Sequence, residues 1–141
     1  MSASERRNGN HGARPLSVLS DDRGELVCER CQVADRPLSR LRGLLGRREL
    51  EPGAGLLLKP CNSVHTFFMR FPIDAVFLDG ERRVLRVRER LRPWRIAGAR
   101  GAHAVLELPA GEAERRGVVA GERLYLTPAA TKEAEAVGAA R

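Results

Sequence analysis

Three side chains capable of chemistry lie in the stretch CNSVHTFFMRFPIDAVFLD, residues 61–79. Cys61 and His65 are separated by three residues, and Asp74 follows inside an apolar run. A thiol, an imidazole and a carboxylate together meet the requirements for a nucleophile, its base and the group that orients the base. However, the flanking residues resemble neither a nucleophile elbow nor a helix N-terminus that would activate the thiol. We therefore assign no catalytic residue and leave enzyme activity open.

The same side chains could contribute to a metal site. Cys28 and Cys31 combine with Cys61 and His65 into a Cys₃His set, a ligand combination that is used for structural zinc. The sequence around Cys28 and Cys31 is typical of a strand, however, and positions three apart on a regular strand point to opposite faces. Buried cysteines without a ligand explain the same residues. Copper(I), with Met69 as a thioether ligand, ranks below zinc. We assign no metal ligand, and the cofactor is unknown.

Asp74 and Trp94 complete the candidate site. A carboxylate inside an apolar strand has to find a donor, because burying it unpaired is costly. We favour a structural ion pair between Asp74 and an arginine, for example Arg40. Trp94, the single tryptophan, stands between two arginines in RPWRI, where it either covers the core or forms one wall of a ligand cleft. The sequence therefore predicts a binding cleft near Cys61, His65, Asp74 and Trp94.

The chain is basic, with a net charge of +7 carried almost entirely by arginine. Residues 81–100 contain eight arginines together with Trp94. A basic surface with an aromatic residue can hold phosphates and stack a base, as nucleic-acid-binding proteins do. The same alternation of residues is typical of an ordinary solvent-exposed strand face. Nucleic acid therefore remains an alternative partner, and an unidentified small molecule or peptide is favoured.

The length of 141 residues fits a single domain, and 43% hydrophobic residues predict a folded globular protein. Three cysteines are an odd number, which argues against a disulfide framework and fits a reducing compartment. No stretch approaches the roughly 20 apolar residues of a membrane span. We therefore expect a cytoplasmic protein with no membrane partner.

Short strands separated by turns dominate the predicted fold. Strand patterns cover 25–34, 56–59, 63–69, 103–108 and 123–127, and two more flank Asp79-Gly80, a dipeptide typical of a tight type I′ hairpin turn. Leucine spacing predicts a helix at 35–46, and a single helical turn is expected at 111–117. The fold class is α+β and mostly antiparallel β: a small curled sheet or partial barrel with one short helix and one helical turn.

We expect one domain, 24–128, between a flexible N-terminal arm at 1–23 and a flexible C-terminal tail at 129–141. The arm is polar, and the tail is rich in alanine with no packing stripe. Most of the aromatic residues lie close together within the domain, so we place the centre of the core there. These residues are Phe67, Phe68, Phe71 and Phe77.

Three longer motifs resemble one protein family. LSRLRGLLGRREL (38–50), GAGLLLKPCNSVHTFFMRFPIDAVFLD (53–79) and AHAVLELPAGEAERRGVVAGERL (102–124) are similar to the bacterial and archaeal family catalogued as domain of unknown function 192. The resemblance implies a compact β-rich domain and no established reaction. The positions that match the family's characteristic residues are Arg40, Gly43, Met69, Pro72, Asp74, Glu107, Pro109 and Gly111. We assign structural roles to Arg40, Met69, Glu107 and Gly111, whereas Cys28 and Cys31 match no family motif.

The leading functional hypothesis is a small, non-catalytic binding domain. One alternative is a metalloprotein or thiol enzyme that uses Cys61 and His65, and the other is an arginine-driven nucleic-acid-binding protein. Salt-sensitive binding to DNA or RNA would favour the nucleic-acid hypothesis. A thiol at Cys61 that reacts rapidly at neutral pH would favour catalysis.

Overall fold

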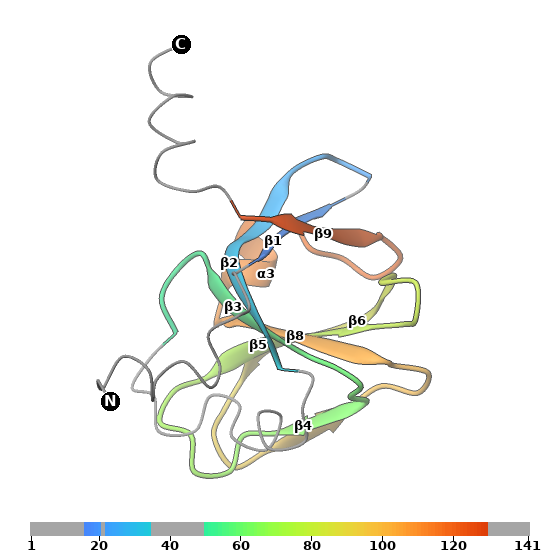
Figure 1. The fold of residues 1–141 in the computed structure, drawn as a ribbon. Coiled ribbons are helices and arrows are strands. Elements are labelled where there is room, and N and C mark those ends of the chain that lie inside the picture. The colour runs from blue at the N-terminus through green and yellow to red at the C-terminus, as the bar shows by residue number, and fades with distance from the viewer. Residues whose placement is uncertain (1–15, 21, 35–49, 130–141) are drawn as a thin grey trace, which may run out of the picture.

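The computed structural model describes residues 16–20, 22–34 and 50–129, whose strands form two sheets (Figure 1). The small sheet pairs β4 (Ser63–His65) with β7 (Ile96–Gly98). The strands of the larger sheet are β1 (Leu16–Ser20), β2 (Leu26–Ala34), β3 (Ala54–Leu58), β5 (Ile73–Leu78), β6 (Val84–Leu91), β8 (Ala104–Pro109) and β9 (Leu124–Pro128). They lie in the order β6-β5-β8-β3-β2-β1-β9.

The larger sheet is curled and mostly antiparallel, as predicted, but it is not wholly antiparallel. Strands β2 and β3 pair in parallel, which the long connection between them allows. The curl brings the two outer strands of the sheet together at one end. There, Arg83 forms an isolated bridge with Arg123, and the amide of Leu124 donates to the carbonyl of Arg82 at 2.9 Å. The sheet is therefore a partial barrel.

The central strands are buried on both faces, which explains why their sequences are continuous apolar runs rather than alternating ones. Successive residues of a strand point to opposite faces. On β5, Phe77 packs in a cluster that also contains Val64 and Ala97 of the small sheet. Its neighbour Val76 packs in a second cluster, which contains Ala113. Different layers therefore cover the two faces of β5, and this decides where its polar residue can point.

One short helix, α3 (Glu112–Arg115), is present in the described residues. It begins directly after Gly111, whose φ of 91° is a conformation that glycine adopts at little cost. The other predicted helix, at 35–46, falls outside the described residues. No helix in the part of the chain that the structure describes is long and apolar enough to cross a membrane.

The predicted flexible arm at 1–23 is wrong for its last residues. Residues 16–20 form β1, which pairs with β2 on one side and β9 on the other. Val18 of this strand is buried in the core. LSVLS is short, but pairing on both sides satisfies its backbone and makes the strand an interior one.

The strand predicted at 63–69 is shorter than expected. Strand β4 ends at His65, and Thr66 begins a turn in which the amide of Met69 donates to the carbonyl of Thr66 at 3.2 Å. Phe68, in the middle of this turn, has a φ of 66°. The backbone therefore leaves the strand before the side-chain alternation of the sequence ends.

The hairpin between β5 and β6 also differs from the prediction. The connection is the loop 79–83 rather than a tight type I′ turn centred on Asp79-Gly80. Its positive φ of 65° falls on Arg82. The carboxylate of Asp79 accepts hydrogen bonds from the amides of Glu81 and Arg83 at 2.8 and 2.9 Å, which stabilises the wider loop.

Candidate functional site

A row of four ring side chains lies at one end of the small sheet. The ring centroids of His65 and Phe67 are 5.1 Å apart, those of Phe67 and Trp94 are 5.7 Å apart, and those of Phe68 and Trp94 are 4.7 Å apart. These separations are typical of favourable aromatic pairs. Phe68 is 70% exposed and Trp94 is 56% exposed. We refer to His65, Phe67, Phe68 and Trp94 as the aromatic surface.

The buried side chain of Thr66 fixes the two loops that carry these rings. Its hydroxyl donates to the carbonyl of Arg92 at 2.6 Å and accepts from the amide of Arg95 at 2.9 Å. The backbone of Thr66 also donates to the carbonyl of Arg95 at 2.8 Å and accepts from the amide of Trp94 at 2.9 Å. One residue therefore ties the turn after β4 to the loop before β7, so the rings have a defined placement.

Two residues of the aromatic surface have strained backbones. Phe68 has a φ of 66° and Trp94 a φ of 64°, both in the left-handed region. For residues other than glycine, such conformations cost about 1–3 kcal/mol each and cluster at functional sites. The described non-glycine residues with positive φ are Phe68, Arg82, Arg90 and Trp94. Half of these strained positions therefore carry rings of the aromatic surface.

Cys61 precedes β4, and His65 ends it. The thiol of Cys61, which is half-buried, donates to the carbonyl of Ser63 at 2.9 Å. The Nδ1 atom of the exposed His65 accepts from the amide of Phe67 at 3.3 Å. Both contacts are with nearby backbone groups, and neither supplies the thiol with a base.

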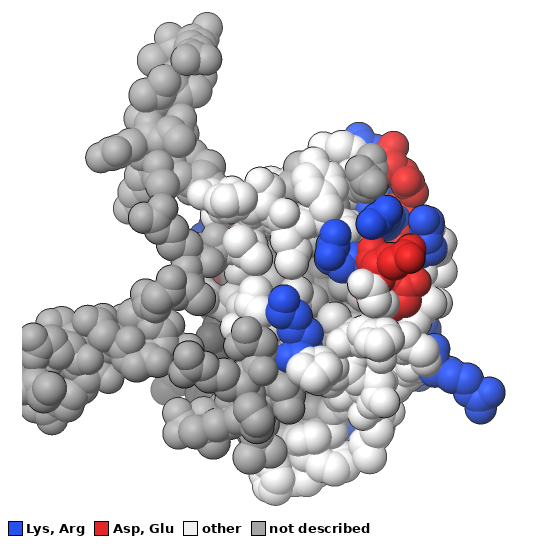
Figure 2. Space-filling view, turned by 45° about the vertical axis from the view of Figure 1, so that its right-hand side comes forward, with Lys and Arg blue, Asp and Glu red and all other residues white. Residues whose placement is uncertain are grey.

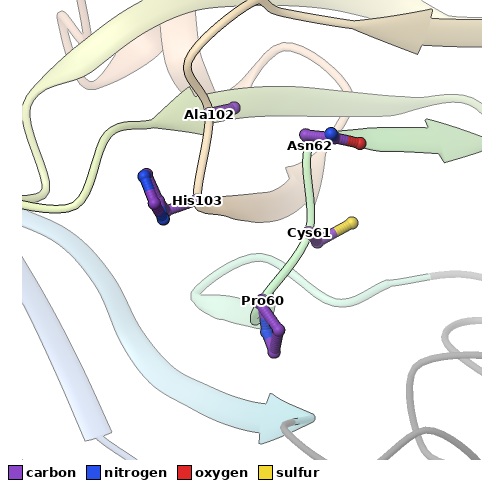
Figure 3. Close-up of a pocket in the computed structure, with 5 residues that line it drawn as sticks. All are labelled: Pro60, Cys61, Asn62, Ala102 and His103. Atoms are coloured by element: carbon purple, nitrogen blue, oxygen red, sulfur yellow. The ribbon is translucent and has the colours of Figure 1, made fainter.

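A shallow hollow of about 230 Å³ lies beside Cys61. It is lined by Pro60, Cys61, Asn62, Ala102 and His103 (Figure 3). The sulfur of Cys61 and the imidazole of His103 point in opposite directions in this view. The hollow is smaller than the roughly 300–1,000 Å³ that is typical of small-molecule sites. The aromatic surface is therefore the stronger candidate for a binding site.

Asp74 does not join the aromatic surface. Its fully buried carboxylate accepts from the amide of Arg90 through Oδ1 and from the amide of Ala113 through Oδ2, both at 2.8 Å. It therefore points to the α3 side of the larger sheet, opposite the face that the small sheet covers. We expected an arginine to pair with this carboxylate, but two backbone amides satisfy it instead. Arg40 lies outside the described residues.

Cys28 and Cys31 face the same core cluster, although a regular strand would point them apart. An irregular register between β2 and β1 explains the difference, because Cys31 lies opposite Leu16 and Cys28 opposite Val18. The hydrogen bond between the two thiols lowers the pKa of Cys28 and raises that of Cys31. Within the described residues, no group of three or more His, Cys, Asp or Glu side chains is arranged to hold a metal ion.

Charged side chains around α3 form ion pairs. Arg116 contacts Glu29 at 2.8 Å and Glu112 at 2.9 Å, and Arg115 contacts Glu112 at 2.7 Å. The hydrogen bond from Arg115, together with that from Arg116, holds the pKa of Glu112 below its usual range. On the face drawn in Figure 2, acidic side chains gather in one area together with basic ones.

The remaining residues to which we assigned structural roles are placed as follows. Met69 is buried in the cluster beneath the small sheet, and Glu107 is buried on β8. Gly111 precedes α3. None of the three contributes a ring to the aromatic surface.

The comparisons with known proteins bear on the whole domain. The model of the domain of unknown function 192 family, described as "Uncharacterized ACR", matches residues 18–126. The chain belongs to this family. The match confirms the resemblance read from the three sequence motifs, and it brings no established activity.

Two archaeal relatives in the family are named UPF0127 proteins. The one from Thermococcus sibiricus is 31% identical over 99 residues, which cover 67% of this chain and 64% of that protein. The one from Pyrococcus abyssi is 37% identical over 87 residues, which cover 57% of this chain and 71% of that protein. This chain therefore spans slightly less than two thirds of the length of the Thermococcus relative.

Two solved structures share the fold of this family member. A protein from Sinorhizobium meliloti, described as a proposed transcription regulator, aligns with a TM-score of 0.70 and 25% identity over 80% of this chain and 92% of that one. A protein of unknown function from Novosphingobium aromaticivorans aligns with a TM-score of 0.69 and 22% identity over 84% of this chain and 96% of that one.

Sequence reasoning about this family member missed Thr66, Phe67 and Phe68. It placed four phenylalanines at the centre of the core, whereas Phe77 is fully buried and Phe68 is largely exposed. Strand alternation does not supply a signal, because it places Phe68 on the same face as Val64 and Thr66, which are both buried. The role of Thr66 depends on contacts with residues 92–95, which no local pattern predicts.

Proposed function

We propose that this protein is a small, non-catalytic binding domain whose ligand docks on the aromatic surface. The observation that carries the proposal is the outward and strained placement of Phe68 and Trp94. Burying such a side chain is worth about 1.5–3 kcal/mol, and a left-handed backbone costs about 1–3 kcal/mol. Glycine would avoid both costs, and a polar residue would avoid the exposure of an apolar ring. A ligand that stacks on the rings explains why aromatic residues occupy these positions.

The chemistry of the aromatic surface suits a ligand that carries a flat ring. Neighbouring rings are tilted toward one another with centroids 4.7 to 5.7 Å apart, and Thr66 ties together the loops that carry them. A site that is organised before binding loses less conformational entropy when the ligand arrives. A small molecule or a peptide with an aromatic side chain meets this description.

The single tryptophan makes the proposal directly testable, because all tryptophan emission comes from Trp94. We would titrate the protein with N-acetylphenylalanine amide, adenosine and maltose while recording this emission, because none of these compounds emits in the range of tryptophan. We expect at least one of the ring-bearing compounds to change the emission saturably. In the Phe68→Gly variant, which removes a ring at an exposed position, the same compound should bind about 2- to 12-fold more weakly, as expected when one aromatic contact is lost.

Val119→Ala provides a matched control, because Val119 is another exposed apolar residue but lies in the loop after α3. This variant should bind like the wild type. Saturable binding that Phe68→Gly leaves unchanged would place the site elsewhere. The absence of any saturable response to the panel would refute a ring-binding surface.

A further inference from the structure

We infer that the ligand of the aromatic surface is single-stranded nucleic acid, with bases stacked on Phe68 and Trp94 and phosphates held by Arg70, Arg92 and Arg95. The inference rests on the proposed function, and it adds the charge of the segments that build the surface. It names both the ligand class and the residues that recognise each part of it.

Two segments of the chain form the small sheet and its loops, residues 60–72 and 92–103. Together they contain no aspartate or glutamate. Their arginines are Arg70, Arg92, Arg95 and Arg100, and all four are exposed. A surface with one sign of charge and no internal counter-charge attracts anionic ligands.

The arginines near the aromatic surface also differ from those around α3 in their partners. Ion pairs among the described residues involve Arg23, Arg90, Arg115 and Arg116. None of these pairs includes Arg70, Arg92 or Arg95, so their guanidinium groups are not neutralised by described carboxylates. Arg95 donates to the carbonyl of Trp94 at 3.3 Å, which keeps its guanidinium close to the Trp94 backbone.

Aromatic rings and unneutralised arginines in adjacent positions match the two parts of a nucleic acid strand. Every base has a flat face that can stack on an aromatic ring, and every linkage carries a negative phosphate. In a duplex the bases are stacked on one another, so exposed rings on a protein favour a single strand, whose bases can be splayed out. An anionic lipid surface shares the attraction to arginine, and we therefore include vesicles in the test.

The main measurement is the fluorescence anisotropy of a labelled 15-nucleotide oligo(dT) titrated with the protein between 50 and 300 mM NaCl. Three phosphate contacts predict a slope of log K against log salt of about −2, since each contact on a single strand contributes about −0.7. Phe68→Gly should weaken binding by about 5- to 150-fold, the effect of losing one stacked base, and leave the slope unchanged. Replacing both Arg92 and Arg95 with Gln should reduce the magnitude of the slope by about 1.4.

Arg30→Gln provides the matched charge control. Arg30 is exposed on β2 of the larger sheet, and its loss lowers the net charge by one without touching the small sheet. This variant should bind oligo(dT) within about 2-fold of the wild type, because it removes no phosphate contact. If Arg30→Gln weakens binding as much as the Arg92 and Arg95 double variant does per arginine, net charge alone drives binding and the inference is overturned.

The remaining outcomes separate this inference from the proposed function. If adenosine changes the emission of Trp94 but oligo(dT) binds no more tightly than adenosine, the proposed function stands and the inference fails. If neither oligo(dT) nor any ring-bearing compound of the panel binds, both fail. Equal binding to a 15-base-pair duplex, with no effect of Phe68→Gly, would overturn the inference. Binding to vesicles of 30% phosphatidylglycerol and 70% phosphatidylcholine, without binding to oligo(dT), would make the aromatic surface a lipid-binding site.

Discussion

Substitutions at Phe68 test whether this residue is held outward at a cost to stability. Phe68→Gly and Phe68→Ala both remove the ring, so they differ mainly in the Cβ atom at a φ of 66°. At ordinary positions glycine is less stable than alanine by about 0.5–1 kcal/mol. In the left-handed region, a Cβ costs about 1–2 kcal/mol. We therefore expect Phe68→Gly to be more stable than Phe68→Ala by about 0.5–1 kcal/mol.

The comparison with the wild type follows from exposure. Phe68 is 70% exposed, so it buries about 60 Å² of a side-chain surface of roughly 200 Å². This burial is worth about 1.5 kcal/mol, which the relief of backbone strain largely offsets in Phe68→Gly. The free energy of unfolding of Phe68→Gly should therefore lie within about 1 kcal/mol of the wild-type value. By contrast, Phe77→Ala, which empties a fully buried position, should cost about 3–5 kcal/mol.

The assay is equilibrium urea unfolding followed by far-ultraviolet circular dichroism, with the slope of the unfolding free energy against urea compared among the variants. Phe68→Ala being as stable as Phe68→Gly would show that the backbone strain is not real in solution. A loss of more than about 3 kcal/mol in Phe68→Gly, as for a core residue, would show that the ring is structural. Either result would remove the observation on which the proposed function depends.

Three further predictions concern the frame of the domain. Asp74→Asn should lower the free energy of unfolding by about 2–4 kcal/mol in urea titrations. The carboxylate accepts from two backbone amides, and the NH₂ group of the asparagine would face one of them, donor against donor. A change below about 0.5 kcal/mol would refute this role of Asp74. Gly55→Ala should cost about 1–3 kcal/mol in the same assay, because the added Cβ would lie 2.8 Å from the sulfur of Cys28. An unchanged free energy of unfolding would show that the side chain of Cys28 or the neighbouring strands shift to accommodate the Cβ atom. The hydrogen bond from Arg115 lowers the pKa of Glu112 in the folded protein. The stability contributed by the Glu112 carboxylate is therefore fully present above the unfolded pKa of about 4.3, and it is lost as the pH falls through the lower native pKa. Glu112→Gln should therefore lower Tm at pH 7 and approach the wild-type Tm near pH 3, whereas a constant difference across this range would contradict the assignment.

Much of the strand content was predictable because it follows from local patterns. The apolar run of β5 and the alternation around it identify strands before any contact is known. The wider loop at 79–83 was not predictable from Asp79-Gly80 alone, because the carboxylate of Asp79 bonds to amides further along the loop. The parallel pairing of β2 with β3 was also missed, since strand direction within a sheet depends on the long connection between them.

The sequence by itself determined a β-rich domain with a partial-barrel sheet, its family, and a stretch around β4 and β5 in which a site would lie. These features depend on apolar periodicity and on motifs that are contiguous in the chain. Only the tertiary structure decided that Asp74 bonds to the amide of Ala113, 39 residues away, and that Thr66 bonds to the amide of Arg95, 29 residues away. Such contacts require the curl of the larger sheet and the pairing of β4 with β7, which no local pattern specifies. For this reason Asp74, which we predicted in the binding site, has a structural role, and Phe68, which we predicted in the core, belongs to the aromatic surface.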